Sequence, residues 1–137
     1  NKNIVAGLQS ENCNAIGLSG ADGNLIHAKR RPLKELFSKE KNDTIKVDYG
    51  LVGDLDESSI DRRGLYKLLE AGFTPVFSAI THDGKGQLLN TNADTIASAI
   101  SIAMSKDYET SLIFCFEICV AYLFGASSFL AIPHLHA

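Results

Sequence analysis

Three short polar side chains stand close together where a predicted strand gives way to a predicted helix. They are Asn90, Asn92 and Asp94, within the stretch QLLNTNADTIA of residues 87–97. Asparagine amides can donate to and accept from a carboxylate or an amide. The free N–H groups at the start of a helix favour an anion. A binding site for a small acidic ligand is therefore one interpretation of this stretch.

The same residues also have a purely structural interpretation. Asn92 has the residue type of a helix N-cap, and Asp94 would stand in the first turn, where its charge complements the helix dipole. The two interpretations are compatible, and the residue types alone do not decide between them. Both require that a strand ends and a helix begins near Asn92.

The elements around this stretch predict an α/β fold. Helices alternate with short, continuously apolar strands, which is typical of a largely parallel sheet covered on both faces. Ligands bind at the carboxyl edge of such a sheet. The predicted helices are 1–10, a second that begins at Ser58 or Ser59 and ends at Gly72, and 93–104, and the predicted buried strands are 13–20, 73–80 and 110–116.

Other segments carry weaker patterns. Residues 33–44 are densely charged, which predicts an exposed loop or a short helix. Residues 45–57 alternate apolar and polar side chains, as a strand does. Gly50 and Gly53 interrupt that alternation and indicate a bulge or a close backbone approach. Asp83-Gly84 within residues 82–87 predicts a hairpin turn.

Length and composition exclude several classes of protein. The chain has 137 residues, enough for one domain, and its net charge of −3 comes with no basic tract. We therefore expect no nucleic-acid partner. Its 3 cysteines are too few for a disulfide framework and are not at zinc spacing, so we expect a reducing, cytoplasmic location and no metal site.

The composition changes abruptly after Glu117. Residues 118–137 contain no Asp, Glu, Lys or Arg, whereas the preceding chain is well charged. We expect one partial domain over residues 1–117 and an aberrant apolar tail over residues 118–137. Two alternatives remain open for the tail: a core strand followed by a buried segment, or a membrane anchor formed by residues 110–132.

Several motifs, in order, resemble those of the acetylglutamate kinases, which are part of the amino acid kinase family. They are VDYGLVGD at 47–54, LLEAGFTPVFSAI at 68–80 and GQLLNTNADTIA at 86–97, and the resemblance covers residues 1 to about 117. It implies a three-layer αβα sandwich, and a homo-oligomer in the full-length enzymes. It also implies transfer of the γ-phosphoryl group of ATP, with Mg²⁺, to the side-chain carboxylate of N-acetylglutamate, or of N-succinylglutamate, in arginine biosynthesis.

The resemblance also assigns roles to matching residues. It places Asn90 on the α-carboxylate side of the acyl-amino acid, with Asn92 and Ala93 lining the same pocket. It places Asp94 where the family has an acidic residue that orients two catalytic lysines. That role suits the chemistry, because the attacking carboxylate is already ionised at neutral pH and needs no general base. Phosphoryl transfer needs positioning and positive charge instead.

Some of the family's residues have no match in this sequence. These are the first strand with its lysine and Gly-Gly phosphate loop, the arginine that binds the substrate, and the second lysine. We therefore expect a partial domain that does not catalyse phosphoryl transfer by itself. The rival hypotheses are a non-catalytic module that binds an acyl-amino acid, and a membrane-tethered protein anchored by residues 110–132.

Overall fold

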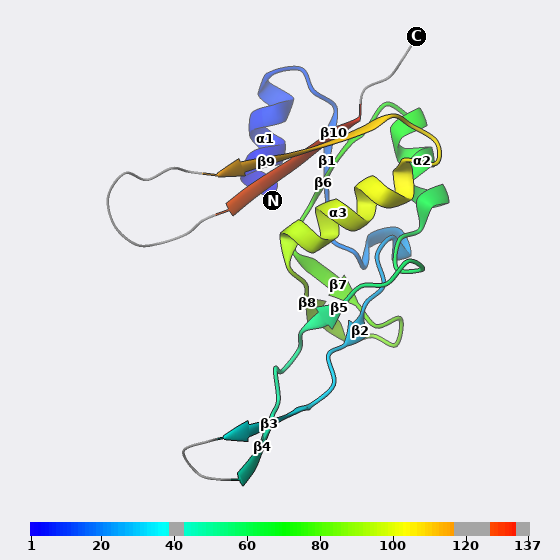
Figure 1. The fold of residues 1–137 in the computed structure, drawn as a ribbon. Helices are drawn as coiled ribbons and strands as arrows, with labels where there is room; N and C mark the ends of the chain where they lie inside the picture. The colour runs from blue at the N-terminus through cyan, green and yellow to red at the C-terminus, as the bar shows by residue number, and fades with distance from the viewer. Residues whose placement is uncertain (39–42, 117–126, 134–137) are drawn as a thin grey trace, which may run out of the picture.

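The computed structural model describes residues 1–38, 43–116 and 127–133 (Figure 1). The helices are α1 (Lys2–Ser10), α2 (Arg62–Glu70) and α3 (Ala93–Met104), with a short 3₁₀ helix at Asp22–Asn24. The strands are β1 (Ala15–Leu18), β2 (Lys29–Arg30), β3 (Lys34–Ser38), β4 (Asp43–Val47), β5 (Gly53–Asp54), β6 (Thr74–Phe77), β7 (Ile80–His82), β8 (Leu88–Asn90), β9 (Thr110–Phe116) and β10 (Ser127–Pro133).

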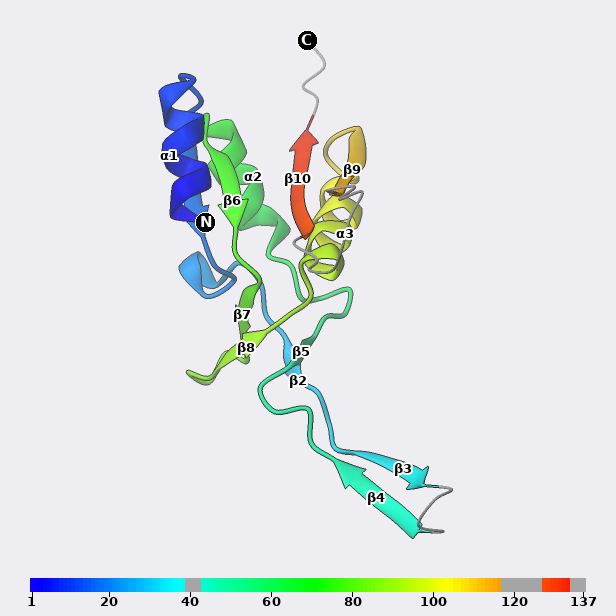
Figure 2. The same ribbon diagram turned by 90° about the vertical axis from the view of Figure 1, so that its left-hand side faces the viewer.

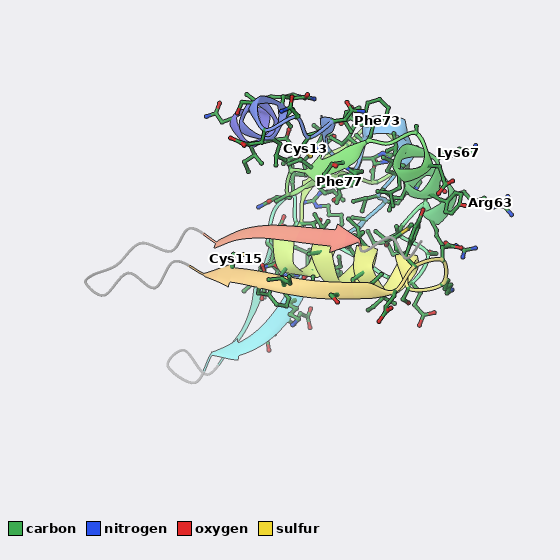
Figure 3. All side chains as sticks on the ribbon, turned by 90° about the horizontal axis from the view of Figure 1, so that it is seen from above. Cys13, Arg63, Lys67, Phe73, Phe77 and Cys115 are labelled. Atoms are coloured by element: carbon green, nitrogen blue, oxygen red, sulfur yellow. The ribbon has the colours of Figure 1, made fainter. Side chains whose placement is uncertain are left out.

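The centre of the fold is a parallel pair of strands. β1 and β6 pair in register from Ala15 opposite Thr74 to Leu18 opposite Phe77. Helix α1 lies on one side of this pair, and α2 and α3 lie on the other (Figure 2). Seen from above, Phe77 lies between the α1 side and α3, while Arg63 and Lys67 of α2 point outward (Figure 3). This arrangement confirms the predicted α/β class and its αβα layering in a partial domain.

Antiparallel ladders surround the central pair. β7 pairs with β8, β3 with β4, β2 with β5 and β9 with β10. Parallel pairing within the described residues is confined to the β1–β6 ladder and two isolated bridges, His27 with His82 and Val52 with Asn90. The paired strands β2 and β5 are separated in the chain by β3 and β4, whereas a connection of a few turn residues can close only an antiparallel hairpin. The turn at Asp83-Gly84 is one such connection and confirms the predicted hairpin.

The hydrophobic core lies between the parallel pair and helices α2 and α3. Its most buried members come from the segment after β1 and from both helices: Leu25, Ile26, Leu65, Ile96 and Met104. Ile26 has no exposed surface. The predicted helix at 93–104 is confirmed, and it buries Ile96, Ala97 and Met104.

The prediction of a loop or short helix over residues 33–44 is wrong for the residues that the structure describes there, and residues 39–42 lie outside the described ranges. β3 and β4 instead form a hairpin that extends away from the rest of the molecule (Figures 1 and 2). Lys34 and Glu35, two of the charges that suggested a loop, lie on an exposed two-stranded ribbon, where Lys46 Nζ is 3.5 Å from Glu35 Oε1 on the facing strand. Cross-strand charge pairs of this kind suit a solvated strand as well as a loop.

Two further expectations were wrong in detail. The cap of α2 is Asp61, whose side chain accepts a hydrogen bond from the Arg63 amide, rather than Ser58 or Ser59. Ser59 is buried because its hydroxyl accepts a hydrogen bond from the Asp56 amide at 2.8 Å. β9 is not fully buried, since Ile113 and Phe114 are 51% and 40% exposed. The ladder with β10 satisfies the backbone hydrogen-bonding groups along one edge of β9, but it does not cover these side chains.

The apolar C-terminal segment is described only in part. Its residues 127–133 form β10, which pairs with β9 from Ser127 opposite Phe116 to Pro133 opposite Thr110. The rest of the predicted tail lies outside the described residues, so its aberrant character stays a prediction. Within the described ranges, no helix is both long enough and apolar enough to cross a membrane.

The core supports a first prediction about stability. Leu65 is 3% exposed, whereas Ile102 on α3 is 69% exposed. We expect Leu65→Ala to lower the free energy of unfolding by about 2–5 kcal/mol, because the substitution leaves a cavity. The control Ile102→Ala should change it by about 0.5 kcal/mol or less. Urea unfolding followed by circular dichroism measures both, and equal losses would contradict this placement of the core.

Candidate functional site

The start of α3 lies at the carboxyl edge of the parallel pair. As β6 ends, the Ser78 amide donates to Leu18 O at 2.8 Å, so the two strands leave the sheet side by side. The Thr91 amide then donates to Ala79 O at 3.0 Å, which places the residue before the Asn92 cap against the chain that leaves β6. This is the edge at which the predicted parallel sheet was expected to bind its ligand.

Asn90 is the last residue of β8, and its backbone is held from two directions. It faces Ile80 across the β7–β8 ladder, and its amide donates to Leu51 O at 2.7 Å. Its side chain is exposed. The backbone is therefore fixed while the side-chain amide remains open to solvent.

Asn92 caps α3, as its structural interpretation predicted. Its side-chain oxygen accepts a hydrogen bond from the Thr95 amide at 3.1 Å. Because the cap uses Oδ1, the side-chain NH₂ group keeps its donors for a ligand. The cap and the ligand-binding interpretation therefore remain compatible in the folded chain.

Ala93 and Asp94 form the first turn of α3 and are partly buried. Asp94 is the one acidic residue of that turn, where the positive end of the helix favours its charge. None of the ion pairs found among the described residues includes Asp94. The lysines that the resemblance would place beside Asp94 are therefore not supplied by the described part of the chain.

The polar residues of the turn alternate between two sides. Asn90 and Asn92 are exposed, whereas Thr91 between them is only 2% exposed. Adjacent residues of an extended segment point to opposite faces, so both asparagine side chains lie on the face opposite Thr91. The structure thus brings Asn90, Asn92, Ala93 and Asp94 together in one turn and buries none of them deeply.

Sequence reasoning missed the buried hydroxyl groups behind this turn. Thr91 Oγ1 lies 2.8 Å from Thr81 Oγ1 and donates to Gly53 O at 3.2 Å. A Cβ at Gly53 would lie 2.6 Å from Thr91 Oγ1, so the close approach predicted for this glycine is confirmed. A threonine between two asparagines, directly after a predicted strand, was the one sequence signal that could have revealed Thr91.

Charged groups near β5 are paired with one another. Arg31 holds Asp54 through two guanidinium nitrogens, with Nη2 at 2.6 Å from Oδ1, and this hydrogen bonding lowers the pKa of Asp54. Lys29 Nζ lies 2.7 Å from Asp56 and lowers the pKa of that carboxyl. An open hollow of about 360 Å³ is lined by Arg30, Arg31, Pro32, Leu33 and Asp48, and by none of the predicted site residues.

The described residues do not supply a metal site by themselves. No group of three or more His, Cys, Asp or Glu side chains that could hold an ion occurs among them. Asp94 stands without a second carboxylate in its helical turn. The side chains in the described ranges therefore do not fit Mg²⁺ as a protein-bound ion, and no catalytic step is assigned to it below.

Comparison with known proteins identifies the family to which this fold belongs. The model of the amino acid kinase family matches residues 1–114, and the chain belongs to that family. The chain is 47% identical over 118 residues to the acetylglutamate kinase of Cytophaga hutchinsonii. It is 47% identical over 117 residues to that of Bacteroides fragilis and 38% identical over 104 residues to that of Myxococcus xanthus.

These relatives are considerably longer than the matching region. The alignments cover 86%, 85% and 76% of this chain, but only 40%, 40% and 33% of the three relatives. The chain thus spans less than half the length of the relatives that it matches. Residues 115–137 lie beyond the region matched by the family model.

The cap geometry supports a second prediction. We expect Asn92→Ala to lower the free energy of unfolding by about 1 kcal/mol, because the Thr95 amide loses its acceptor. Asn92→Asp keeps an acceptor oxygen and should cost much less. Thermal unfolding of the three proteins tests this, and equal stability of Asn92→Ala and the unsubstituted chain would contradict the cap.

The Arg31–Asp54 pair supports a third prediction, about pH. Because the pKa of Asp54 is lowered in the folded chain from its ordinary value of 3.8, the pair stabilises the fold above that pH. This contribution is lost as the pH falls below about 4. We expect Arg31→Gln to reduce the loss of stability between pH 6 and pH 3, measured as the shift in urea midpoint. An unchanged shift would show that the pair does not couple folding to pH.

Proposed function

We propose that this chain forms part of the acyl-amino-acid-binding half of a kinase that phosphorylates the side-chain carboxylate of N-acetylglutamate or N-succinylglutamate in arginine biosynthesis. The observation that supports it most directly is the turn at residues 90–94. Asn90 and Asn92 are exposed on one face of that turn, at the N-terminal end of α3, in a member of the amino acid kinase family.

Amide chemistry supports the acyl-amino-acid end of the proposal. An acylated glutamate carries carboxylates and an amide, which need hydrogen-bond donors together with at least one acceptor. Asn90 provides both on an exposed side chain, and the Asn92 NH₂ group adds donors beside the N-terminal end of α3. Ala93 leaves room for the ligand because its side chain is a single methyl group.

Asp94 acts in this proposal as an orienting group for cations. A substrate carboxylate needs no base, so a catalytic aspartate would have no proton to remove. Aimed alone at a phosphate, the Asp94 charge would oppose binding. Its use is to hold ammonium groups where negative charge develops on the transferring phosphoryl group. None of the ion pairs among the described residues includes Asp94. Other segments would therefore have to supply the lysines that carry those ammonium groups.

A second candidate function follows from that missing partner. A chain with the asparagine turn but without cations on Asp94 could bind an acyl-amino acid without transferring phosphate. This non-catalytic module differs from the first proposal in one respect: it needs no nucleotide. Full activity of a longer protein that contains this chain, lost on Asp94→Asn, would favour the kinase over the module.

Ligand binding provides a fourth prediction. We expect N-acetylglutamate to bind the 137-residue chain with an affinity of about 1 mM, because few polar contacts are available to it. Nuclear magnetic resonance titration of the ¹⁵N-labelled chain should shift the signals of Asn90, Asn92 and Ala93. The Asn90→Ala variant should weaken binding about tenfold, through loss of a hydrogen bond to a charged group.

The control is Asn3→Ala on the exposed face of α1, which should leave the affinity unchanged. The same preparation, supplied with ATP and N-acetylglutamate, should release no ADP above the rate without protein. Turnover by the isolated chain would contradict the assignment of the cations to other segments. Shifts that spare residues 90–93 would contradict the binding site.

A further inference from the structure

We propose that Thr91 is a positioning residue for the candidate site, acting through a hydroxyl relay that it forms with Thr81 and the Gly53 carbonyl. This inference rests on the proposed function, because the side chains that it positions are those of Asn90 and Asn92. Thr91 itself has no access to a ligand, since it is 2% exposed. It acts only by fixing the backbone from which both asparagines project.

The shorter distances favour one assignment of donors over the alternative, in which Thr91 Oγ1 donates to Thr81 Oγ1 and Thr81 Oγ1 donates to Leu89 O at 3.4 Å. Thr91 Oγ1 donates its hydrogen to Gly53 O at 3.2 Å, and Thr81 Oγ1 can then donate to Thr91 Oγ1 at 2.8 Å. Each hydroxyl is satisfied, although Thr81 has no exposed surface. Buried hydroxyl groups are retained without penalty only when they are paired in this way, and a chain of such bonds is mutually strengthening.

The relay connects three separate segments behind the site. Thr81 lies in β7, Gly53 begins β5, and Thr91 follows β8 directly. The Thr91 amide is also engaged, donating to Ala79 O at 3.0 Å. Thr91 is thus held through both its backbone and its side chain, and it cannot rotate without breaking bonds to two neighbouring segments.

The asparagines depend on that restraint because of their positions in the chain. Asn90 precedes Thr91 and Asn92 follows it, so rotation of the Thr91 backbone would turn both side chains away from their shared face. Misplacement by about 1 Å is enough to weaken an oriented interaction strongly. Gly53 is part of the same device, because a Cβ there would lie 2.8 Å from Ala28 Cβ and 3.0 Å from Thr81 Oγ1.

The decisive experiment compares three variants of the whole chain. Thr91→Val keeps the side-chain volume but removes the hydroxyl, and Thr91→Ser keeps the hydroxyl. We expect Thr91→Val to weaken N-acetylglutamate binding about tenfold and Thr91→Ser to weaken it less than about twofold. The double variant Thr81→Val with Thr91→Val should regain part of the stability lost in Thr91→Val, because it removes the buried Thr81 hydroxyl, whose one remaining acceptor would be Leu89 O at the long distance of 3.4 Å.

Affinity and stability separate the positioning role from a merely structural one. In the double variant the Gly53 carbonyl still lacks its donor, so binding should stay weak even where the melting temperature recovers. Recovery of affinity together with stability would overturn the proposal, as would unchanged affinity in Thr91→Val. Either result would leave Thr91 as an ordinary packed residue.

A nuclear magnetic resonance measurement made without ligand distinguishes failure of this inference from failure of the proposed function. The backbone amide order parameters of residues 90–92 report the restraint that the relay places on this segment. These order parameters should fall in Thr91→Val and remain high in Thr91→Ser, whether or not N-acetylglutamate binds. If the unsubstituted chain does not bind N-acetylglutamate, the proposed function alone is contradicted. If the order parameters are unchanged in Thr91→Val, the positioning role of the relay is contradicted.

Discussion

The parallel ladder between β1 and β6 is the constraint on which the rest of the structure depends. Because the two strands run in the same direction, both end at one edge, and the chain leaving β6 must turn there. That turn becomes the β7–β8 hairpin, and the end of the hairpin returns to the chain leaving β6 at the Thr91–Ala79 hydrogen bond. Helix α3 can therefore start only at the edge where parallel sheets bind ligands.

The candidate site inherits its rigidity from backbone and buried hydroxyl groups rather than from charge. Asn90 and Asn92 project from a segment held by bonds to Leu51, Ala79 and Gly53. The ion pairs found among the described residues, such as Arg31 with Asp54 of β5, involve none of Asn90, Asn92 and Asp94. None of those ion pairs would therefore have to break before these three side chains could contact a ligand.

Local patterns predicted much of this arrangement. The bounds and cap of α3, the β1 and β6 strands and the Asp83-Gly84 hairpin each depend on residues within a few positions of one another. The loop or short helix predicted at 33–44 and the serine cap predicted for α2 were wrong because both depend on competition: charges that pair across strands, and a serine that bonds elsewhere. The Thr81–Thr91–Gly53 relay joins distant residues and could not be predicted from spacing.

Helix α1 is attached to the sheet differently from the other helices. None of its residues is buried, and it is held by polar side chains that reach strand carbonyls: Asn1 to Val76 O at 2.6 Å, Lys2 to Gly17 O at 2.9 Å and Gln9 to Ala15 O at 2.8 Å. Denaturants that solvate peptide groups compete directly with such bonds. The contacts that hold this helix should accordingly weaken at lower urea than the packing of the apolar interior.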